Sequence, residues 1–265
     1  MNKKLLLLGQ GRLASEVLLL MIRKKHFKYF DLKCLVTNDS FYKDFVSIYK
    51  NESPIFINNS NRNEDRIKKC IESNEIDIIF SIQHPWILSE GIIDSVKNKA
   101  FNLHNAKLPD YKGYNSISHS LINGDKYYYS TIHMMVDKAD EGKVICESKI
   151  PIKKNDDALS LYLKTIKNVN ILFSNFIEQK LFESKIEYNQ PPRKGVFYKK
   201  NSLDELRDLK DINDSEQFDK HVRAVFFPPF EPAFIKVGLK KFYQIPNKRR
   251  QLIMSNIAPE NKHKF

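Results

Sequence analysis

Residues 4–22 read KLLLLGQGRLASEVLLLMI, an apolar run that two glycines separate from a helical pattern. Lys4–Leu8 has the length and composition of a buried strand, and Gly9 and Gly11 end it with a tight turn. Leu13–Ile22 then carries apolar residues on one helical face. A short strand, a tight turn and a helix are typical of the first βα unit of a parallel sheet.

The same alternation of strand and helix continues along most of the chain. The further strands that we predict are Leu32–Val36, Pro54–Ile57, Ile76–Ser81 and Ala100–His104, followed by Tyr127–Val136 and Lys143–Ile152, two β-rich segments that we expect to be antiparallel. The further helices that we predict are Asn63–Ser73, Glu90–Asn98, Asn115–Ile122 and Ala158–Glu178. The sequence therefore predicts an α/β fold, a Rossmann-like and mostly parallel sheet with helices on both faces.

The final third of the chain has a different composition, because prolines become frequent after residue 186. Short apolar runs lie at Val196–Tyr198, Val222–Phe227 and Phe234–Val237, so we expect a small β-rich C-terminal portion. The predicted organisation is a large domain over residues 1–185, a small β-rich region over 186–250 and a basic tail over 251–265, whose order the sequence leaves open.

The overall composition is that of a globular protein, with 265 residues, 42% of them hydrophobic, and a net charge of +12. Residues 236–265 alone carry eight Lys or Arg and one acid, Glu260, so the rest of the chain is only weakly basic. This is a weak case for nucleic-acid binding and a fair one for an anionic small substrate. We expect Lys248, Arg249 and Arg250 to lie in a solvated tail.

The sequence was also searched for targeting segments and for cysteine motifs. The apolar run near the start is too short for a signal peptide or a membrane span, so we expect a cytoplasmic protein without stable membrane insertion. Cys34, Cys70 and Cys146 are scattered, with no CxxC spacing, which argues against a disulfide framework and a structural zinc site.

The turn Gly9-x-Gly11-x-x-Ala14 is a first candidate site, because a dinucleotide-binding fold has its phosphate-binding turn at this place. Asp39 follows the second strand, where such folds carry a ribose ligand, but Thr37–Ser40 also fits an ordinary turn. We favour a structural turn and keep an NAD-dependent oxidoreductase as an alternative.

A second and more specific candidate site follows the strand Ala100–His104. Asn102 and His104 are two residues apart, so their side chains project to the same face of the strand, and Asp140-x-Gly142 comes later in the chain. An amine that attacks a carbonyl produces an oxyanion, which the Asn102 amide can stabilise as a donor. His104 can accept the proton of the amine, and Asp140 can orient the imidazole or stabilise its charged form. We interpret Cys146, His119 and His133 as structural.

Two segments around these residues carry a family resemblance: FNLHNAKLPDYKGYN at 101–115 and STIHMMVDKADEG at 130–142. They resemble the core signature of the formyltransferases that use N10-formyltetrahydrofolate, which act on glycinamide ribonucleotide, methionyl-tRNA or sugar nucleotides. By this resemblance, Asn102, His104 and Asp140 fall on the catalytic positions. No metal is implied.

The resemblance also implies binding residues. SIQHPWIL at 81–88 is similar to the loop where the family seats the pterin ring. The residues expected to bind the folate cosubstrate are Gln83, His84, Pro85, Trp86, Ile87 and Asp137. The residues expected near the diphosphate of the second substrate are Lys107, Tyr111, Lys112 and Asn115, which follow the His104 strand.

The C-terminal segments Gly195–Lys200 and Arg223–Phe230 resemble those of sugar N-formyltransferases, not the barrel of the tRNA branch. The implied substrate is a nucleotide-linked amino sugar, with dTDP-4-amino-4,6-dideoxyglucose expected first, for surface polysaccharides such as the lipopolysaccharide O-antigen. We also expect a homodimer whose interface includes residues within 190–235 and faces away from the catalytic group. A non-catalytic nucleotide-sugar binding module is a second alternative, disfavoured because all three catalytic residues are present.

Overall fold

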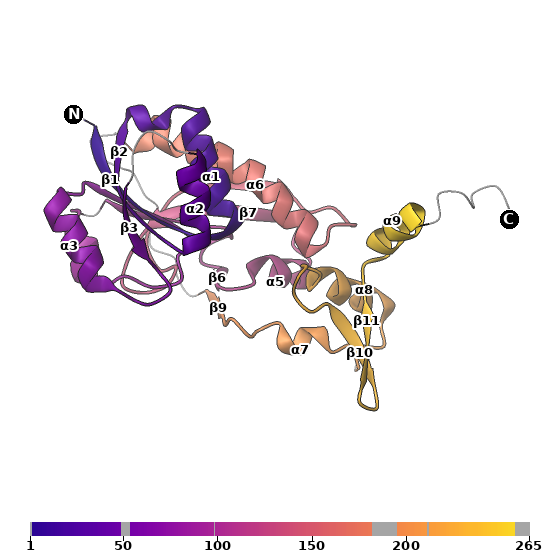
Figure 1. Cartoon of the computed structure of the whole chain (residues 1–265). Coiled ribbons are helices and arrows are strands. Elements are labelled where there is room, and N and C mark those ends of the chain that lie inside the picture. Colours follow the sequence, from indigo (N-terminus) through magenta and orange to yellow (C-terminus); the bar gives the residue numbers. More distant parts are fainter. Residues whose placement is uncertain (1, 49–53, 98, 182–194, 211, 258–265) are drawn as a thin grey trace. The chain divides into compact units, whose positions relative to one another are not determined.

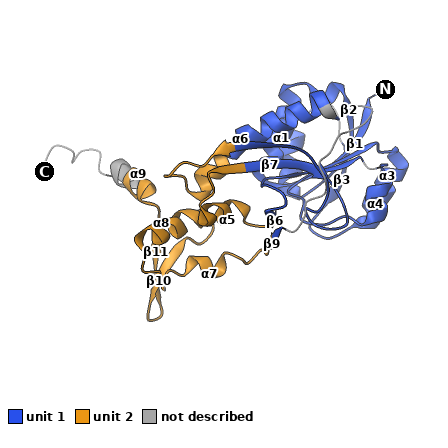
Figure 2. Ribbon diagram, turned by 180° about the vertical axis from the view of Figure 1, so that it is seen from behind, with its two compact units in different colours: residues 1–112, 129–149, 165–196 blue, residues 113–128, 150–164, 197–265 orange. Residues whose placement is uncertain are grey.

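The computed structural model describes residues 2–48, 54–97, 99–181, 195–210 and 212–257 (Figure 1). These residues form two compact units whose segments alternate along the chain (Figure 2). The first unit takes residues 1–112, 129–149 and 165–196, and the second takes 113–128, 150–164 and 197–265. The domain boundary predicted near residue 186 lies outside the described residues and stays a prediction.

The first unit is built on a seven-stranded sheet with the order β3-β2-β1-β4-β5-β7-β8. Its strands are β1 (Lys3–Gly9), β2 (Phe30–Thr37), β3 (Ile55–Asn58), β4 (Ile78–Ile82), β5 (Ala100–His104), β7 (Tyr127–Met134) and β8 (Val144–Pro151). The pairs from β3 to β5 are parallel, and β7 runs antiparallel to β5. The prediction of a mostly parallel α/β sheet is therefore confirmed.

Helices cover both faces of this sheet, which explains why β1 is an uninterrupted apolar run. On one face, Leu6 and Leu8 of β1 share a buried cluster with Ile67 of α3 (Glu64–Asn74) and Ile92 of α4 (Glu90–Asp94). The opposite face carries Phe80 and Phe101, which contact aromatic rings from the last turn of α6 (Ala158–Asn175) and from η2 (Phe176–Lys180).

The helix boundaries follow their capping residues. The side chain of Asn63 accepts a hydrogen bond from the Arg66 amide at the start of α3. At the start of α6, the Asp157 carboxylate accepts from the Ser160 amide (2.7 Å). The remaining helices of this unit are α1 (Gly11–Arg23), η1 (His26–Lys28) and α2 (Asp39–Ile48). The turn predicted at Thr37–Ser40 is wrong, because Asp39 is the first residue of α2.

The second unit contains helices and one antiparallel strand pair. Its elements are α5 (Ser116–Asn123), α7 (Asp204–Arg207), α8 (Ser215–Ala224), β10 (Ala233–Val237), β11 (Lys240–Gln244) and α9 (Asn247–Ile257). Two short strands, β6 (Tyr111–Gly113) and β9 (Val196–Tyr198), pair with each other. The small strand pair confirms that part of the C-terminal prediction, whereas the run Val222–Phe227 is the end of helix α8 and the turn after it, not a strand.

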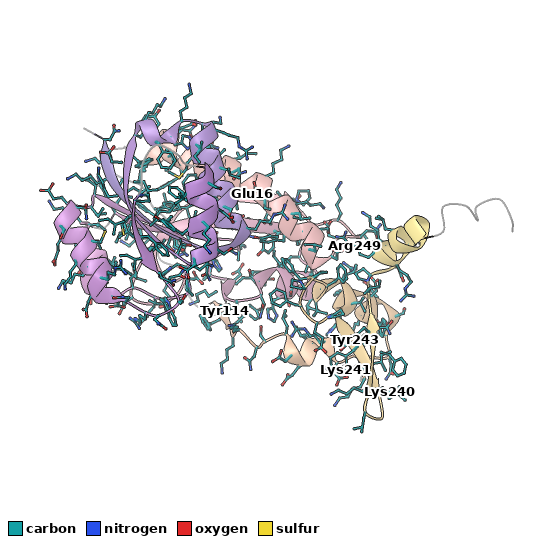
Figure 3. The ribbon with its side chains drawn as sticks, viewed as in Figure 1. Glu16, Tyr114, Lys240, Lys241, Tyr243 and Arg249 are labelled. Carbon is teal, nitrogen blue, oxygen red and sulfur yellow. The ribbon has the colours of Figure 1, made fainter. Side chains whose placement is uncertain are left out.

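The hairpin of β10 and β11 carries exposed side chains. Lys240, Lys241 and Tyr243 project from it (Figure 3), and Leu239 at its turn is fully exposed. Lys241 forms an ion pair with Glu231 (2.7 Å) and lies over the ring of Phe234. Ala233 at the base of the hairpin belongs to a small buried cluster with Leu209, Val222 and Val225.

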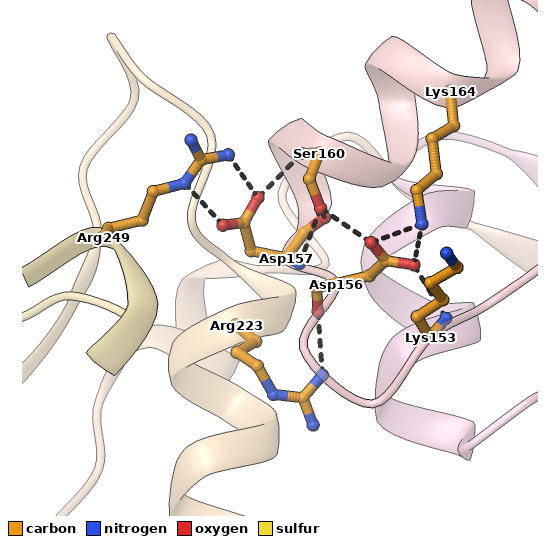
Figure 4. A network of polar contacts seen from close by, with 7 residues as sticks. All are labelled: Lys153, Asp156, Asp157, Ser160, Lys164, Arg223 and Arg249. Carbon is orange, nitrogen blue, oxygen red and sulfur yellow. Dashed lines mark hydrogen bonds and ion pairs between the residues drawn. The ribbon is translucent and has the colours of Figure 1, made fainter. Parts of the chain in front are cut away.

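Polar contacts join α9 to the start of α6 within the second unit (Figure 4). The guanidinium of Arg249 binds both carboxylate oxygens of Asp157, which is 2% exposed (Nε–Oδ2 2.7 Å, Nη2–Oδ1 3.1 Å). Lys164 pairs with the adjacent Asp156, and Arg223 donates to the Asp156 carbonyl. The expectation that Arg249 is solvated is therefore wrong, because a buried carboxylate needs a partner.

No helix in the described part of the chain is both long enough and apolar enough to cross a membrane.

Candidate functional site

Strand β5 positions the two residues that the sequence singles out. β5 lies between β4 and β7, and its alternation buries Leu103 on one face and leaves Asn102 and His104 half-buried on the other. His104 is the last residue of the strand. In open α/β sheets, ligands bind beyond the carboxyl ends of the parallel strands, which is where His104 lies.

His104 has an oxygen beside each ring nitrogen. Its Nε2 lies 2.7 Å from the backbone oxygen of Tyr111, and its Nδ1 lies 3.4 Å from Oδ1 of Asp140. Because a carbonyl oxygen can only accept, Nε2 carries the proton that it donates to Tyr111. Nδ1 is then the basic nitrogen of the neutral ring, and a proton taken up there would face a carboxylate.

His133, which was expected to be structural, is a fourth member of this cluster. Its Nε2 lies 3.0 Å from Nδ2 of Asn102 and 3.5 Å from Oδ1 of Asp140, and its Nδ1 lies 2.7 Å from the Met134 carbonyl oxygen. The signal that could have found it is register, since His133 is the residue of β7 directly opposite Asn102 in β5.

The motif Asp140-x-Gly142 has a local structural reason. Asp140 adopts a left-handed conformation with φ +56°, which Asp tolerates better than most residues. A Cβ on Gly142 would lie 1.7 Å from the Met134 carbonyl oxygen, so only glycine fits there. The same carbonyl accepts a hydrogen bond from Nδ1 of His133. Gly142 therefore leaves room for the backbone group that holds the His133 ring.

The residues predicted near the diphosphate lie in different surroundings. Lys107 pairs with Asp110 (3.0 Å), and Lys112 pairs with Glu141 (3.2 Å), the neighbour of Asp140. The hydrogen bond with Asp110 raises the pKa of Lys107. Tyr111 is buried, and its backbone oxygen holds His104.

Asn115 belongs to the second unit. Its amide donates to the Lys200 carbonyl (3.0 Å) and contacts Ser202 (3.1 Å). In the same unit His119 stacks on Tyr198 and contacts Ser202 (2.8 Å), and burial lowers the pKa of His119 to about 4. These contacts join the start of α5 to the segment after β9. The stacking and hydrogen bond of His119 are those of a structural residue, as expected.

The residues predicted to bind folate follow β4. Gln83, Trp86 and Ile87 are exposed, Pro85 is half-buried, and Asp137 is exposed in the segment between β7 and β8. The Trp86 indole is 40% exposed and is held by a hydrogen bond from Nε1 to the Asn59 carbonyl (2.9 Å). An indole held at its edge with its ring partly exposed can stack on a planar ligand.

His84 lines a hollow beside this segment. Other residues that line it are Val36, Ile57, Asn58, Asn59, Asn61, Arg62, Asn63, Glu64, Ile67, Trp86 and Leu88. Both His84 ring nitrogens are buried without a hydrogen-bond partner among the described residues. Burial lowers the pKa of His84 to about 4, so the ring is neutral at pH 7 and offers one donor and one acceptor.

The glycine-rich turn after β1 is explained by packing. Gly11 has φ +72°, and a Cβ on Gly9 would lie 3.1 Å from that of Ala14. The Gln10 amide donates to the Ile82 carbonyl, and the carboxylate of Asp39 accepts from Asn58 (2.8 Å). The turn therefore needs no dinucleotide to account for its glycines. Among the described residues, no group of three or more His, Cys, Asp or Glu is arranged to hold a metal ion.

Comparison with known families assigns the chain to a family. A family model described as formyl transferase matches residues 4–177. The chain belongs to the formyl transferase family. The matched region contains the first βα unit, the 83–87 segment and the cluster of Asn102, His104, His133 and Asp140.

A curated relative of this chain is described as an N-formyltransferase. GDP-perosamine N-formyltransferase of Brucella melitensis is 27% identical over 167 residues, which are 63% of this chain and 63% of the relative. The chain thus spans 63% of the length of the curated relative that it matches.

Two solved structures share the fold of this chain. A 4-N formyltransferase from Francisella tularensis has a TM-score of 0.76 and 17% identity, and the match covers 92% of this chain and 96% of that one. An N-formyltransferase from Helicobacter canadensis, in complex with folinic acid and dTDP-3-aminofucose, has a TM-score of 0.69 and 20% identity, with coverage of 91% and 86%. The shared fold therefore extends beyond the family match at residue 177.

Proposed function

We propose that this formyl transferase moves a formyl group from N10-formyltetrahydrofolate to the primary amine of a nucleotide-linked amino sugar. The observation that carries the proposal is the cluster at the end of β5, where Asn102, His104 and Asp140 meet in a chain of this family. An amide donor, a basic imidazole nitrogen and a carboxylate are the groups that acyl transfer to an amine requires.

The reaction follows from these groups. The amine nitrogen attacks the formyl carbon, and the oxyanion that forms accepts a hydrogen bond from the Asn102 amide. Nδ1 of His104 takes the proton of the amine, and the imidazolium is stabilised by Asp140 at 3.4 Å. The bond between N10 and the formyl carbon then breaks, and the proton on His104 passes to N10. The products are the formamide of the sugar and tetrahydrofolate.

The donor proposal is supported by the family match and by the related structure that contains folinic acid. We assign Gln83, His84, Pro85, Trp86, Ile87 and Asp137 to the folate site. The partly exposed Trp86 indole offers a stacking surface for a flat heteroaromatic ring. Folate is a substrate here, and the proposal involves no metal.

The acceptor proposal is supported by a relative named for GDP-perosamine and by a related structure in complex with dTDP-3-aminofucose. We propose dTDP-4-amino-4,6-dideoxyglucose as the first acceptor to test, with its formylated product used in a surface polysaccharide such as the O-antigen. Lys107, Tyr111, Lys112 and Asn115 are proposed near the diphosphate, where positive charge and donors bind phosphate oxygens. The cytoplasmic location and the homodimer stay predictions from the sequence.

The test is to incubate the protein with N10-formyltetrahydrofolate and a panel of dTDP-, UDP- and GDP-linked amino sugars, and to measure product masses. We expect one sugar to gain a single formyl group in a reaction that requires the donor. The matched control is His104→Asn, which keeps a side chain of similar size and removes the base, and we expect at least about a hundredfold loss. Turnover of NADH with amino or hydroxy sugars, and no formylated product, would favour the oxidoreductase alternative instead.

A further inference from the structure

The ring of His133 lies between two of the three groups used in the proposed reaction. It is 3% exposed, and Nε2 faces both the Asn102 amide and the Asp140 carboxylate. The proposed mechanism gives this ring no part. His133 is therefore a buried residue of the site that contacts both the oxyanion donor and the carboxylate but has no assigned role.

The Met134 carbonyl decides which nitrogen of His133 carries the proton. This oxygen lies 2.7 Å from Nδ1 and can only accept, so Nδ1 is the protonated nitrogen of the neutral ring. Nε2 is then an acceptor. The group of Asn102 that faces it at 3.0 Å must be the NH2 group, because the amide oxygen would oppose a lone pair.

We propose that His133 is a positioning residue that fixes the orientation of the Asn102 amide through the chain Met134 carbonyl, His133 and Asn102. One N–H of Asn102 is donated to Nε2, and its second N–H is left for the oxyanion. This inference rests on the proposed function for its kinetic consequence, whereas the orientation itself is a property of the protein without substrates.

Two features keep the chain of contacts in register. Asn102 and His133 are direct cross-strand partners in the antiparallel pair of β5 and β7, so the strands fix the distance between them. Gly142 leaves room for the Met134 carbonyl, since a Cβ on residue 142 would collide with that oxygen. A backbone group thus sets the tautomer of a histidine, and the histidine sets the orientation of an amide.

The orientation can be tested without turnover. A long-range proton–nitrogen NMR spectrum of the uniformly labelled full chain at pH 7.5 distinguishes the two tautomers of a neutral histidine. We expect His133, assigned by comparison with His133→Gln, to carry its proton on Nδ1. A proton on Nε2 would overturn the proposal, whatever the enzyme does with folate or sugars.

The kinetic test uses a matched pair of variants. The amide of Gln ends about where Nε2 of His lies, so His133→Gln can still accept from Asn102, whereas the shorter His133→Asn reaches only the position of Nδ1. We expect kcat to fall at least tenfold in His133→Asn, with KM changed less than threefold. This decrease in kcat is a part of the roughly 10²–10³-fold decrease that loss of an oxyanion donor causes. His133→Gln should recover most of that loss.

A double-mutant cycle separates positioning from a general structural role. If His133 acts through Asn102, His133→Asn should cause no further loss of kcat in an Asn102→Ala background. Losses that multiply in the double variant, or equal kcat values for the Gln and Asn variants in folded protein, would overturn the proposal. If the unaltered chain formylates no sugar of the panel, the proposed function fails, and the tautomer measurement still decides whether His133 orients Asn102.

Discussion

His104 has its orientation and its charge controlled by different groups. The Tyr111 carbonyl accepts from Nε2 and fixes the ring, while Asp140 lies beside Nδ1, the nitrogen that takes the proton in the proposed reaction. Of the two roles that the sequence left open for Asp140, orientation and charge stabilisation, the geometry favours the second. The role of Tyr111 could not be read from the sequence, because every residue has a backbone oxygen.

Replacement of Asp140 by Asn should change both the rate and its pH dependence. The imidazolium of His104 loses the negative charge beside it, so we expect turnover to fall at least about tenfold and the acid-side loss of activity to move to lower pH. The measurement is kcat/KM from pH 5 to 9. Glu141→Gln is the matched control, because it removes the same charge from the adjacent residue, and equal profiles for both variants would contradict the assignment.

His84 should make the folded protein less stable in acid. Its pKa is lowered to about 4 in the folded chain, against about 6.5 when unfolded, so below pH 6.5 the unfolded state binds a proton that the folded state does not. Stability is then lost as the pH falls toward 4, with a contribution of about 2 kcal/mol at pH 5.

The measurement is urea unfolding at pH 7 and pH 5 without ligands. We expect the free energy of unfolding to fall less between the two pH values in His84→Leu than in the unaltered chain. The same decrease in both proteins would show that the pKa of His84 does not differ between the folded and unfolded states, and would contradict the prediction.

At the scale of elements, the segment between β7 and β8 supports the site through one glycine. Gly142→Ala should push the Met134 carbonyl away from its place, because the added Cβ would lie 1.7 Å from that oxygen. We expect a loss of unfolding free energy of about 1–3 kcal/mol, the usual cost of overpacking, and a lower kcat through His133.

The matched control is Gly91→Ala in helix α4, where an added Cβ meets nothing within 4 Å. Alanine there should leave stability unchanged or raise it by up to about 1 kcal/mol, because glycine is a poor helix residue. Calorimetry and kinetics on both variants check the expectation, which is wrong if the two substitutions have the same effect.

The central strands β1 and β4 could be predicted from the sequence because they are buried on both faces and read as apolar runs. Helix α2 was missed because Thr37–Ser40, where it begins, also fits an ordinary turn. Helix α8 was missed because its sequence is largely polar. Its signal was the spacing of Phe218, Val222 and Val225, which puts one apolar face on the small cluster of the second unit. The candidate site was predicted from residue types, and His133 was missed because the two strands were never paired with each other.

At the scale of the whole molecule, the expected homodimer has exposed apolar residues within 190–235, notably Val196, Phe197 and Phe230, which is 62% exposed. We expect a mass near two chains by light scattering at micromolar concentration, and a mass near one chain for Phe230→Asp. Ile171→Asp is the matched control, because Ile171 is a comparably exposed apolar residue of α6 outside this range. One chain in the unaltered protein, or dissociation by both variants, would contradict the predicted interface.

The bond between Arg249 and the buried Asp157 has a consequence for biosynthesis. Asp157 is made 92 residues before its partner, so a ribosome releases the start of α6 long before the guanidinium that neutralises this carboxylate exists. All the strands of the large sheet precede α6 in the chain, whereas the helices that enclose the Val222 cluster, and then α9, follow it. The sheet can therefore begin to form during translation, whereas the ion pair of Asp157 can form only after α9 has left the exit tunnel.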